Sequence, residues 1–323
     1  MKKIVILMST YNGEKFLAEQ IESILNQKLN RHQYSISLFI RDDGSNDSTK
    51  AIINEYVLNN PNVIYDLHDN MGNLGVKKSF IKLAQTADAD FYFFSDQDDI
   101  WLPNKIHDML EVLDTADGKP KGVYSDLWIA DDKAQSTGVL MKHGGQNTAK
   151  VLKNNGMVSH KELLFTYLVT GASFAFNHKF KDKFLSRAKL SDFQNIRMHD
   201  SYIALILSIE NGLYYIDKPL VLYRQHSNNV LGATKSHQKK LWDYIIRFRE
   251  PIENRAQILR DVKLIIDSFD INNSNINELR EFIEVFGGKN YWKKWKKINH
   301  YSYYLTVSPK LAEKILYTFF VRI

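Results

Sequence analysis

The stretch Phe91-Tyr92-Phe93-Phe94-Ser95-Asp96-Gln97-Asp98-Asp99 joins a wholly apolar run to a cluster of carboxylates. Four consecutive apolar residues fit a strand that is buried on both faces, which is typical of the centre of a parallel sheet. The carboxylates then stand at the carboxyl end of that strand, where open α/β sheets bind their ligands. The stretch therefore predicts an α/β fold with a polar site directly after residue 94.

The segments before residue 91 alternate apolar runs with helical patterns. Strands are predicted over 4–8, 36–40 and 63–65, and helices over 12–25, 47–56 and 76–84. This alternation predicts βαβ units and a parallel sheet. Asn12 is expected to cap the first helix, because Asn is a favoured N-cap residue, and Pro103 fits the first turn of a fourth helix.

After residue 122 the strands come closer together. Strands are predicted over 123–126, 173–176, 213–216 and 220–224, and a helix over 200–209. We expect these strands to extend the same sheet rather than to form a second one. The chain beyond residue 231 is helical, basic and aromatic in pattern.

Composition excludes several classes of protein. The 323 residues include no cysteine, so neither a disulfide framework nor a thiolate metal site can form. The apolar run at 4–8 is too short for a signal peptide, and no run approaches the ~20 residues of a transmembrane helix. We therefore expect a cytoplasmic protein. The net charge of +6 is compatible with nucleic acid, anionic lipid or water, but no nucleic-acid-binding motif is present, so no such partner is expected.

Polar residues follow three of the predicted strands: Ser9-Thr10-Tyr11-Asn12-Gly13, Asp42-Asp43-Gly44-Ser45 and Asp96-Gln97-Asp98-Asp99. The five carboxylates repel one another unless a cation or hydrogen-bond donors compensate their charge. A hard divalent ion prefers such oxygen ligands and completes its shell with water and phosphate oxygens. The pattern thus favours a metal-bound nucleotide diphosphate, although an aspartate such as Asp47 is expected only to cap a helix.

These three segments, in this order and at this spacing, resemble the signatures of family-2 glycosyltransferases with the GT-A fold, over about residues 1–230. The resemblance implies a Rossmann-like, mostly parallel sheet flanked by helices, followed by a C-terminal helical extension. It divides the chain into a nucleotide-binding half (1–125), an acceptor half (126–230) and a helical region (231–323). The implied reaction moves a sugar from a nucleotide diphosphate to an acceptor hydroxyl, with inversion and with Mn²⁺ or Mg²⁺.

The resemblance also assigns nucleotide-binding roles. Tyr11 is expected to pack on the base and Ser9 to contact the nucleoside. Asp43 is expected to accept the N3–H that uracil and thymine share. Thr10 and Asn73 are assigned to the same nucleotide-binding set.

Metal binding is assigned in the same way to Asp98, with Asp96 supporting the metal shell or the ribose and Asp99 orienting its neighbours. His226 is expected to ligate the metal or contact the diphosphate, and a structural role for this histidine is the alternative. Arg224 is expected to neutralise phosphate charge.

A general base is assigned to Asp200, at the start of a predicted helix. The family most often carries Glu-Asp here, whereas this chain has His199-Asp200. The alternative is that Asp200 is only an N-cap. Gly171 is expected to line the acceptor side or to form a tight turn, and Asp126 to touch sugar hydroxyls or to serve as a turn residue.

Further segments resemble rhamnosyltransferase-like members of the family: Asn73-Leu74-Gly75, Ser95 to Trp101, and Tyr223 to Asn229. They favour dTDP-L-rhamnose as donor. The alternatives are a UDP-hexose-dependent transferase (glucosyl, galactosyl or GalNAc), and a catalytically inactive nucleotide-sugar-binding or receiver-like protein. A nucleotidyltransferase is disfavoured, because its Gly- and Lys/Arg-rich phosphate loop is absent after residue 8.

The acceptor is expected to be a glycan or a polyprenyl-diphosphate-linked glycan, in capsule, cell-wall or other cell-surface polysaccharide synthesis. Near the C-terminus, Tyr291–Lys297 mixes aromatic rings with lysines, and Ile315–Val321 is apolar and aromatic. Such segments suit a peripheral contact with the inner face of the cell membrane. Packing on the catalytic part, or on a second subunit in a homodimer, is the alternative.

Overall fold

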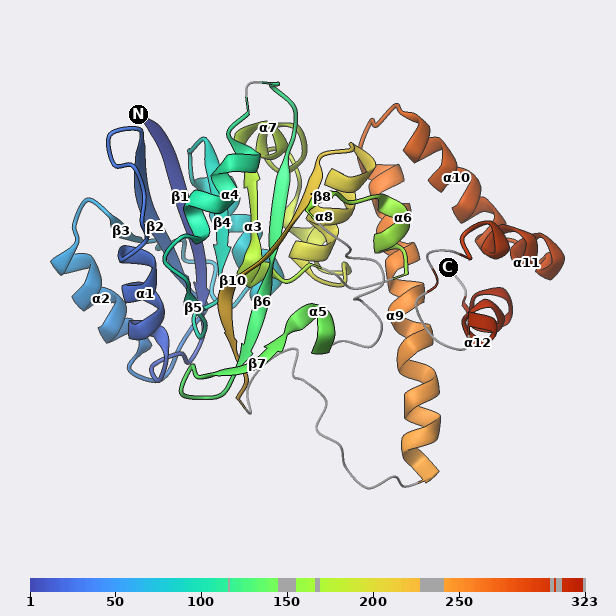
Figure 1. The fold of residues 1–323 in the computed structure, drawn as a ribbon, viewed down its shortest axis with the longest axis horizontal. Helices are drawn as coiled ribbons and strands as arrows, with labels where there is room; N and C mark the ends of the chain where they lie inside the picture. Colours follow the sequence, from blue (N-terminus) through green and yellow to red (C-terminus); the bar gives the residue numbers. More distant parts are fainter. Residues whose placement is uncertain are drawn as a thin grey trace.

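The structure is a computed structural model that describes residues 1–115, 117–144, 155–165, 169–226, 241–302, 305 and 310–321. The described residues form one ten-stranded sheet in the order β3-β2-β1-β4-β9-β6-β10-β5, with β7 paired to β6 and β8 to β10. Figure 1 shows the sheet flanked by helices on both faces. The strands are β1 (Lys2–Thr10), β2 (Tyr34–Asp42), β3 (Ile64–Asp66), β4 (Phe91–Ser95), β5 (Ile100–Trp101), β6 (Gly122–Ala130), β7 (Ser136–Leu140), β8 (Gly156–Met157), β9 (Phe174–Asn177) and β10 (Leu213–Arg224).

The direction of the strands brings the predicted polar segments to one edge. β1 pairs in parallel with β2 and β4, and its register sets Thr10 beside Asp42 and Met8 beside Ser95. β9 runs antiparallel to both β4 and β6, and β10 runs parallel to β6. The parallel sheet predicted for β1 to β4, and its extension by the strands after residue 122, are therefore confirmed, and the added strands make the whole sheet mixed.

Helices cover both faces of this sheet. They are α1 (Leu17–Leu25), α2 (Thr49–Asn59), α3 (Val76–Thr86), α4 (Lys105–Leu113), α5 (Met141–Gly144), α6 (His160–Leu163), α7 (His178–Phe180), α8 (His199–Ile209), α9 (Leu241–Ser268), α10 (Ser274–Gly287), α11 (Tyr291–His300) and α12 (Lys310–Ile315). Short 3₁₀ or π segments lie at Gly171–Ser173, Lys181–Leu185, Leu190–Phe193 and Leu316–Phe320.

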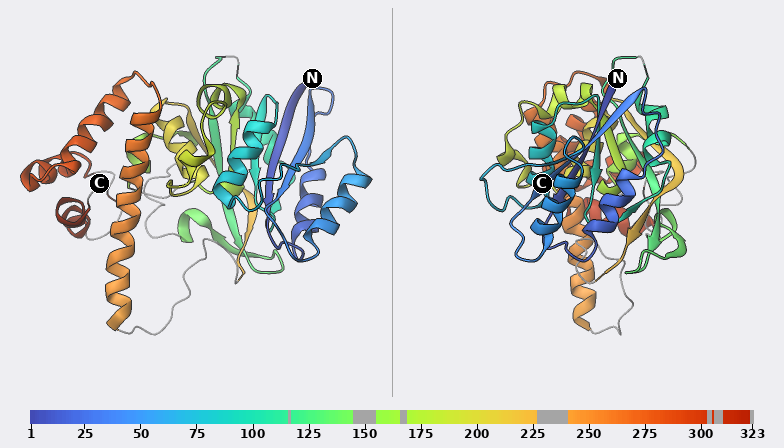
Figure 2. Two further views of the ribbon diagram at one scale, coloured as in Figure 1. Left: turned by 180° about the vertical axis from the view of Figure 1, so that it is seen from behind. Right: turned by 90° about the vertical axis from the view of Figure 1, so that its left-hand side faces the viewer.

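Alternate residues of β1 point into two separate hydrophobic clusters, as the two-residue period of a strand requires. Ile4, Ile6 and Met8 pack with residues of α1, α2 and α4. Val5 and Leu7 pack with residues of α3 and α8 on the opposite face. The two views from front and back show these sets of helices on opposite sides of the sheet (Figures 1 and 2).

The C-terminal helices belong to the second cluster. Leu259 of α9, Phe282 of α10 and Ile298 of α11 are fully buried within it, and the Tyr317 hydroxyl donates to the Leu164 carbonyl at 3.0 Å. These helices gather at the end of the molecule remote from β3 (Figure 1). Among the described residues no helix combines the length and apolar character that a membrane span requires. The boundary predicted near residue 230 lies outside the described residues.

Two local predictions were wrong. Asn12 does not cap α1, which begins at Leu17; Asn12 has a positive φ of 48°, and its Oδ1 accepts from the Asn46 N–H at 2.9 Å. The predicted strands 213–216 and 220–224 are one strand, β10, with register shifts on either side of Pro219. Proline is tolerated there because a bulge removes the need for its missing N–H.

Two glycines allow a matched test of the packing. A Cβ on Gly212 would lie 2.3 Å from the Pro120 carbonyl oxygen, whereas a Cβ on Gly287 would meet nothing within 4 Å. We expect Gly212→Ala to lower the free energy of unfolding by about 1–3 kcal/mol, because backbone must move to admit the methyl group. Gly287→Ala, at the end of α10, should be neutral or stabilising by up to about 1 kcal/mol. Urea denaturation of both variants measures the difference, and equal stabilities would contradict the predicted clash.

Candidate active site

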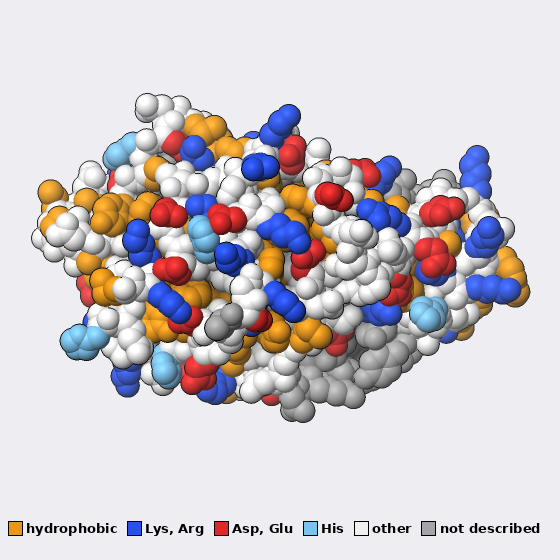
Figure 3. All heavy atoms as spheres, turned by 90° about the horizontal axis from the view of Figure 1, so that it is seen from above, with side chains coloured by type: hydrophobic (Ala, Val, Ile, Leu, Met, Phe, Trp, Pro, Cys, Tyr) orange, Lys and Arg blue, Asp and Glu red, His pale blue; other side chains and the backbone are white. Residues whose placement is uncertain are grey.

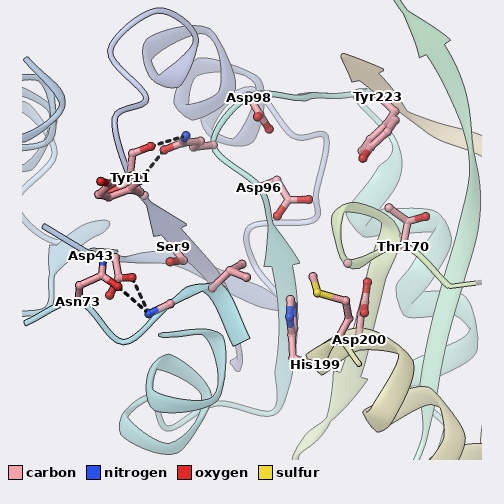
Figure 4. Close-up of a pocket in the computed structure, with 16 residues that line it drawn as sticks. Ser9, Tyr11, Asp43, Asn73, Asp96, Asp98, Thr170, His199, Asp200 and Tyr223 are labelled. Atoms are coloured by element: carbon pink, nitrogen blue, oxygen red, sulfur yellow. Dashed lines mark hydrogen bonds between the residues drawn. The ribbon is translucent and has the colours of Figure 1, made fainter. Parts of the chain in front are cut away.

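A cavity of about 370 Å³ lies beyond the carboxyl ends of β1 and β4 and extends to the start of α8 (Figure 4). Ten of the residues predicted from the sequence line it: Ser9, Thr10, Tyr11, Asp43, Asn73, Asp96, Asp98, Gly171, His199 and Asp200. The other lining residues are Gly75, Val76, Gln97, Thr170, Met198 and Tyr223. Side chains from three strand ends and one helix start therefore meet in one space.

Asp43 is buried at one end of the cavity and is held by several donors. Its Oδ1 accepts from the Leu74 N–H at 2.7 Å, from the Ser79 hydroxyl at 3.0 Å and from Arg41. Its Oδ2 accepts from the Gly75 N–H at 2.8 Å. Oδ2 accepts this one hydrogen bond among the described residues, so its second lone pair can accept from a ligand N–H in the cavity.

Arg41 organises the loop that surrounds Asp43. Its buried guanidinium also bonds the Asp69 carboxylate at 2.8 Å and the Gly72 carbonyl at 2.7 Å. The hydrogen bond from Arg41 lowers the pKa of Asp69. The loop between β3 and α3 is thereby tied to the end of β2. Arg41 was not predicted as a site residue, although its position directly before Asp42-Asp43 was a usable signal.

Gln97 joins the loop after β4 to the loop after β1. Its Oε1 accepts from the Tyr11 N–H at 2.9 Å, and its Nε2 donates to the Tyr11 carbonyl at 3.1 Å (Figure 4). A Cβ on Gly13 would lie 2.3 Å from Gln97 Oε1, so a side chain at this position would displace the Gln97 amide. The pair of bonds fixes the backbone of Tyr11, whose half-exposed ring borders the cavity. The sequence suggested no role for Gln97, because a long-range side-chain bond leaves no local pattern.

Asp96 and Asp98 lie in the middle of the cavity (Figure 4). Burial, followed by the neighbouring charges of Asp98 and Asp200, raises the pKa of Asp96 to about 7. The Asp98 Oδ2 lies 2.9 Å from His226 Nε2, and the His226 ring stacks on Phe16 with centroids 4.8 Å apart. His226 thus lies beside one of the carboxylates, and its role as a metal ligand stays a prediction.

These groups suit a divalent cation of the Mg²⁺ or Mn²⁺ type. Burial is the main cause of the raised pKa of Asp96, and the charges of Asp98 and Asp200 add to it; a cation beside the carboxylates would lower that pKa. Within the described ranges, no three His, Asp or Glu side chains are arranged to hold a metal. Asp98 and His226, which lie 2.9 Å apart, could hold an ion whose other ligands are phosphate oxygens and water, as is usual for Mg²⁺.

Arg224 supports the carboxylate loop and does not line the cavity. Its backbone N–H donates to Asp99 Oδ1 at 3.0 Å, and its Nε donates to the Asp98 carbonyl at 2.8 Å. Its other nitrogens bond the Asp132 carbonyl at 2.7 Å and the Glu19 carboxylate at 2.5 Å. The expectation that Arg224 meets phosphate is therefore not supported, because its guanidinium is used within the protein. Asp99 is buried and does not line the cavity, and its orienting role stays a prediction.

Trp101 and Asp126 are also buried outside the cavity lining. The Lys105 Nζ lies 3.4 Å from the Trp101 ring centroid and donates to the Ala172 carbonyl at 2.5 Å. Asp126 accepts from the Leu127 N–H at 2.9 Å and from the Lys142 N–H at 3.3 Å. The structure thus gives Asp126 a role in holding β6 to α5 rather than a contact with sugar.

Asp200 lies in the first turn of α8 and points into the cavity from the side opposite Asp43 (Figure 4). The N-cap residue of α8 is Met198, so the alternative that Asp200 is only an N-cap is wrong. A carboxylate in the first turn is stabilised by the helix dipole, and Asp200 Oδ1 accepts from the Ser201 N–H at 2.6 Å. The side chain is buried at the border of the cavity, and its role as a general base stays a prediction.

His199 precedes Asp200, and its ring lies against Phe80, with centroids 4.3 Å apart, and against Phe94, at 4.8 Å. Burial lowers the pKa of His199 to about 4. The unfolded chain, in which histidine titrates near 6.5, binds this proton more readily, so stability is lost as the pH falls from 6.5 to 4.

We expect His199→Phe to remove part of this acid sensitivity. The variant should gain stability relative to wild type as the pH falls. Between about pH 7.5 and about pH 5, the difference in free energy of unfolding between the two proteins should change by about 2 kcal/mol in favour of the variant. Urea denaturation at the two pH values measures the shift. Burial also lowers the pKa of His160 to about 4. Because both proteins contain His160, its contribution to the pH dependence is the same in each and does not affect the difference between them. A parallel pH dependence in the two proteins would contradict the burial of a neutral imidazole.

Comparison with known proteins places this geometry in a family. Residues 5–123 match the family model described as glycosyl transferase family 2. The dTDP-rhamnosyl transferase RfbG of Shigella flexneri is 32% identical over 249 residues, which cover 72% of this chain and 76% of RfbG. A GalNAc(5)-diNAcBac-PP-undecaprenol beta-1,3-glucosyltransferase of Campylobacter jejuni is 23% identical, over 81% of this chain and 77% of that protein.

Among solved structures, S. aureus TarS 1-349 in complex with UDP-GlcNAc superposes with a TM-score of 0.58 at 13% identity, covering 98% of this chain and 82% of TarS. This likeness extends over the C-terminal helices and concerns the fold alone. The match to RfbG is stronger support for membership of the family, because it combines substantial sequence identity with coverage of most of both chains. The chain belongs to glycosyltransferase family 2 and has the GT-A fold that its three strand-end motifs predict.

Proposed function

We propose that this glycosyltransferase moves L-rhamnose from dTDP-L-rhamnose to a hydroxyl of a glycan or polyprenyl-diphosphate-linked acceptor, with inversion. One observation carries the proposal: Asp43, the Asp96–Asp98 pair and Asp200 line a single cavity in that order (Figure 4). A nucleotide sugar has the same order of parts, namely base, diphosphate and sugar. The setting we propose is cell-surface polysaccharide synthesis at the inner face of the cell membrane.

The nucleoside would bind at the Asp43 end. The remaining acceptor position on Asp43 Oδ2 suits the N3–H of thymine, and Ser9, Thr10, Tyr11 and Asn73 border the space around it. Uracil carries the same N–H, so this contact serves dTDP- and UDP-sugars alike. The choice of dTDP-rhamnose rests on the similarity to RfbG; a UDP-hexose donor is the alternative.

The diphosphate would lie beside Asp96 and Asp98, with Mn²⁺ or Mg²⁺ held by Asp98 and by His226 or Asp96. When bound, the ion would neutralise the charge that develops on the leaving diphosphate. The protein contributes the placement of these carboxylates, which the Arg224 bonds to Asp98 and Asp99 maintain.

Asp200 would act as the general base. It would take the proton of the acceptor hydroxyl while that oxygen bonds to the anomeric carbon and the bond from this carbon to the phosphate oxygen breaks. A single displacement inverts the anomeric configuration and needs only one base. The position of Asp200 at the cavity end remote from Asp43 suits attack on the face opposite the leaving nucleotide.

A panel of nucleotide sugars tests the donor and the metal. We expect dTDP-L-rhamnose with Mn²⁺ to raise the melting temperature, because a ligand at about 100 times its Kd stabilises the folded state by about 2.7 kcal/mol. Asp98→Ala should abolish the metal-dependent part of the shift. Asp200→Asn should keep the shift but lower transfer about 10²–10⁴-fold.

Thermal shift and an assay of nucleotide diphosphate release read the two effects separately. A larger rise in melting temperature with a UDP-hexose than with dTDP-L-rhamnose would favour the alternative donor. No shift with any donor, for a folded protein, would favour an inactive descendant.

We also propose that the C-terminal helices touch an anionic membrane through a surface made by Tyr291, Trp292, Lys293, Lys296, Phe319 and Phe320. Trp292 is 67% exposed, and the Tyr291 and Phe319 rings lie 5.4 Å apart. Lys296 lies 5.7 Å from the Trp292 ring centroid. Exposed rings beside lysines suit the headgroup region, where cations meet anionic lipid. Figure 3 shows basic and hydrophobic side chains together at this end of the molecule.

Vesicle binding tests this contact. We expect the double variant Trp292→Ala/Phe320→Ala to bind phosphatidylglycerol vesicles several times more weakly than wild type, because both rings leave the interface. Leu58→Ala, which removes an exposed apolar side chain of α2 at the other end of the sheet, is the matched control. Equal binding by all three proteins would contradict the proposal, and a loss of dimer in the double variant would instead indicate a subunit interface.

A further inference from the structure

His199 is a buried polar side chain that has no hydrogen-bond partner among the described residues. It is 2% exposed, and neither Nδ1 nor Nε2 makes a hydrogen bond. Its ring is stacked on Phe80 at an interplanar angle of 18° and meets the edge of Phe94 at 83°. Most buried polar groups in proteins are paired, since an unpaired one destabilises the fold. We therefore expect the ring nitrogens of His199 to find a hydrogen-bond partner that is not part of the chain, such as a bound ligand.

The imidazole faces the cavity, at a point shared with Asp200. Both residues line the cavity, and a Cβ on Gly171 would lie 3.4 Å from His199 Nε2 and equally 3.4 Å from Asp200 Oδ2. Gly171 therefore lies beside both side chains at the border of the cavity. The sequence suggested only an acceptor-side or tight-turn role for this glycine, whereas the structure shows which two side chains it adjoins.

The chemistry of this space suits a hydroxyl group rather than a phosphate. Burial among aromatic rings keeps His199 neutral, so one ring nitrogen donates a hydrogen bond and the other accepts one. A neutral ring beside the Asp200 carboxylate offers no positive charge to a phosphate. A hydroxyl both donates and accepts, and it can bond an imidazole nitrogen in either tautomer. In Figure 4, His199 lies next to Asp200, and Asp43 and Asn73 lie at the far end of the cavity.

We propose that His199 hydrogen-bonds, through Nε2, a sugar hydroxyl held beside Asp200, and that it thereby determines which sugar the enzyme accepts. The inference rests on the proposed function, since it requires a sugar at this end of the cavity. The hydroxyl belongs either to the transferred sugar or to the acceptor. A site built to bond a hydroxyl discriminates strongly against an analogue that lacks it, because the protein group is then left unpaired.

Two substitutions separate this role from packing. His199→Phe keeps an aromatic ring between Phe80 and Phe94 but removes both nitrogens. His199→Gln places an amide near the position of Nε2. We expect His199→Phe to lower kcat/KM about 10- to 100-fold. Its melting temperature near neutral pH should be unchanged or higher, because an unpaired polar group has been removed. His199→Gln should recover part of the activity.

Binding measurements identify which sugar is contacted. The probes are dTDP, dTDP-L-rhamnose and, for transfer, a series of alkyl glycosides. If the hydroxyl is on the donor, His199→Phe weakens binding of dTDP-L-rhamnose and leaves binding of dTDP unchanged. If it is on the acceptor, binding of both nucleotides is unchanged and KM for the alkyl glycoside rises.

Two results would overturn the inference. One is a kcat/KM for His199→Phe that matches wild type. The other is a combined loss of activity and melting temperature that His199→Gln does not relieve, which would show a packing role. Asp200→Asn in the same assay tests the proposed function by itself. Normal transfer by wild type, its loss in Asp200→Asn and its retention in His199→Phe would reject the role of His199 while leaving the proposed function intact.

Discussion

Two buried arginines hold the carboxylates of the cavity in place against their mutual repulsion. Arg41 bonds Asp43 and Asp69 and so joins the end of β2 to the loop before α3. Arg224, at the end of β10, bonds the loop after β4 through the Asp98 carbonyl and also bonds Glu19 of α1. Charge-assisted bonds of this kind are strong when buried. Loss of the Arg41 guanidinium would leave the buried Asp43 carboxylate without its charged partner, which is costly inside a protein.

The far wall of the cavity depends on the C-terminal helices. Lys77 of α3 donates to the Gln194 and Ile196 carbonyls at 2.8 and 2.7 Å, just before α8 begins. Asp261 of α9 accepts from the Arg197 N–H at 3.2 Å, and burial raises its pKa to about 6. The segment that leads into His199-Asp200 is therefore held between α3 and α9. The helices after residue 240 also share one hydrophobic cluster with the sheet.

The cavity has two ends of different chemical character. The Asp43 end is built from charged and backbone groups whose hydrogen bonds are mostly made within the protein, so it is formed before any ligand binds. The Asp200 end joins a rigid carboxylate to an imidazole lodged between aromatic rings. A prearranged first end suits a nucleotide that many transferases share, whereas the second end is where a particular sugar would be distinguished.

The sequence by itself determined the fold class, the strand ends that border the cavity, and ten of the residues that line it. It could do so because apolar periodicity and strand-end motifs are local, and parallel strands bring their carboxyl ends to one edge. Only the tertiary structure showed that Arg224 holds the loop after β4, that Gln97 bonds the Tyr11 backbone, that Asp126 does not line the cavity and that β10 is continuous. These features depend on partners that are tens of residues apart in the chain. Bonds of that kind are decided by how the elements pack, which no local pattern records.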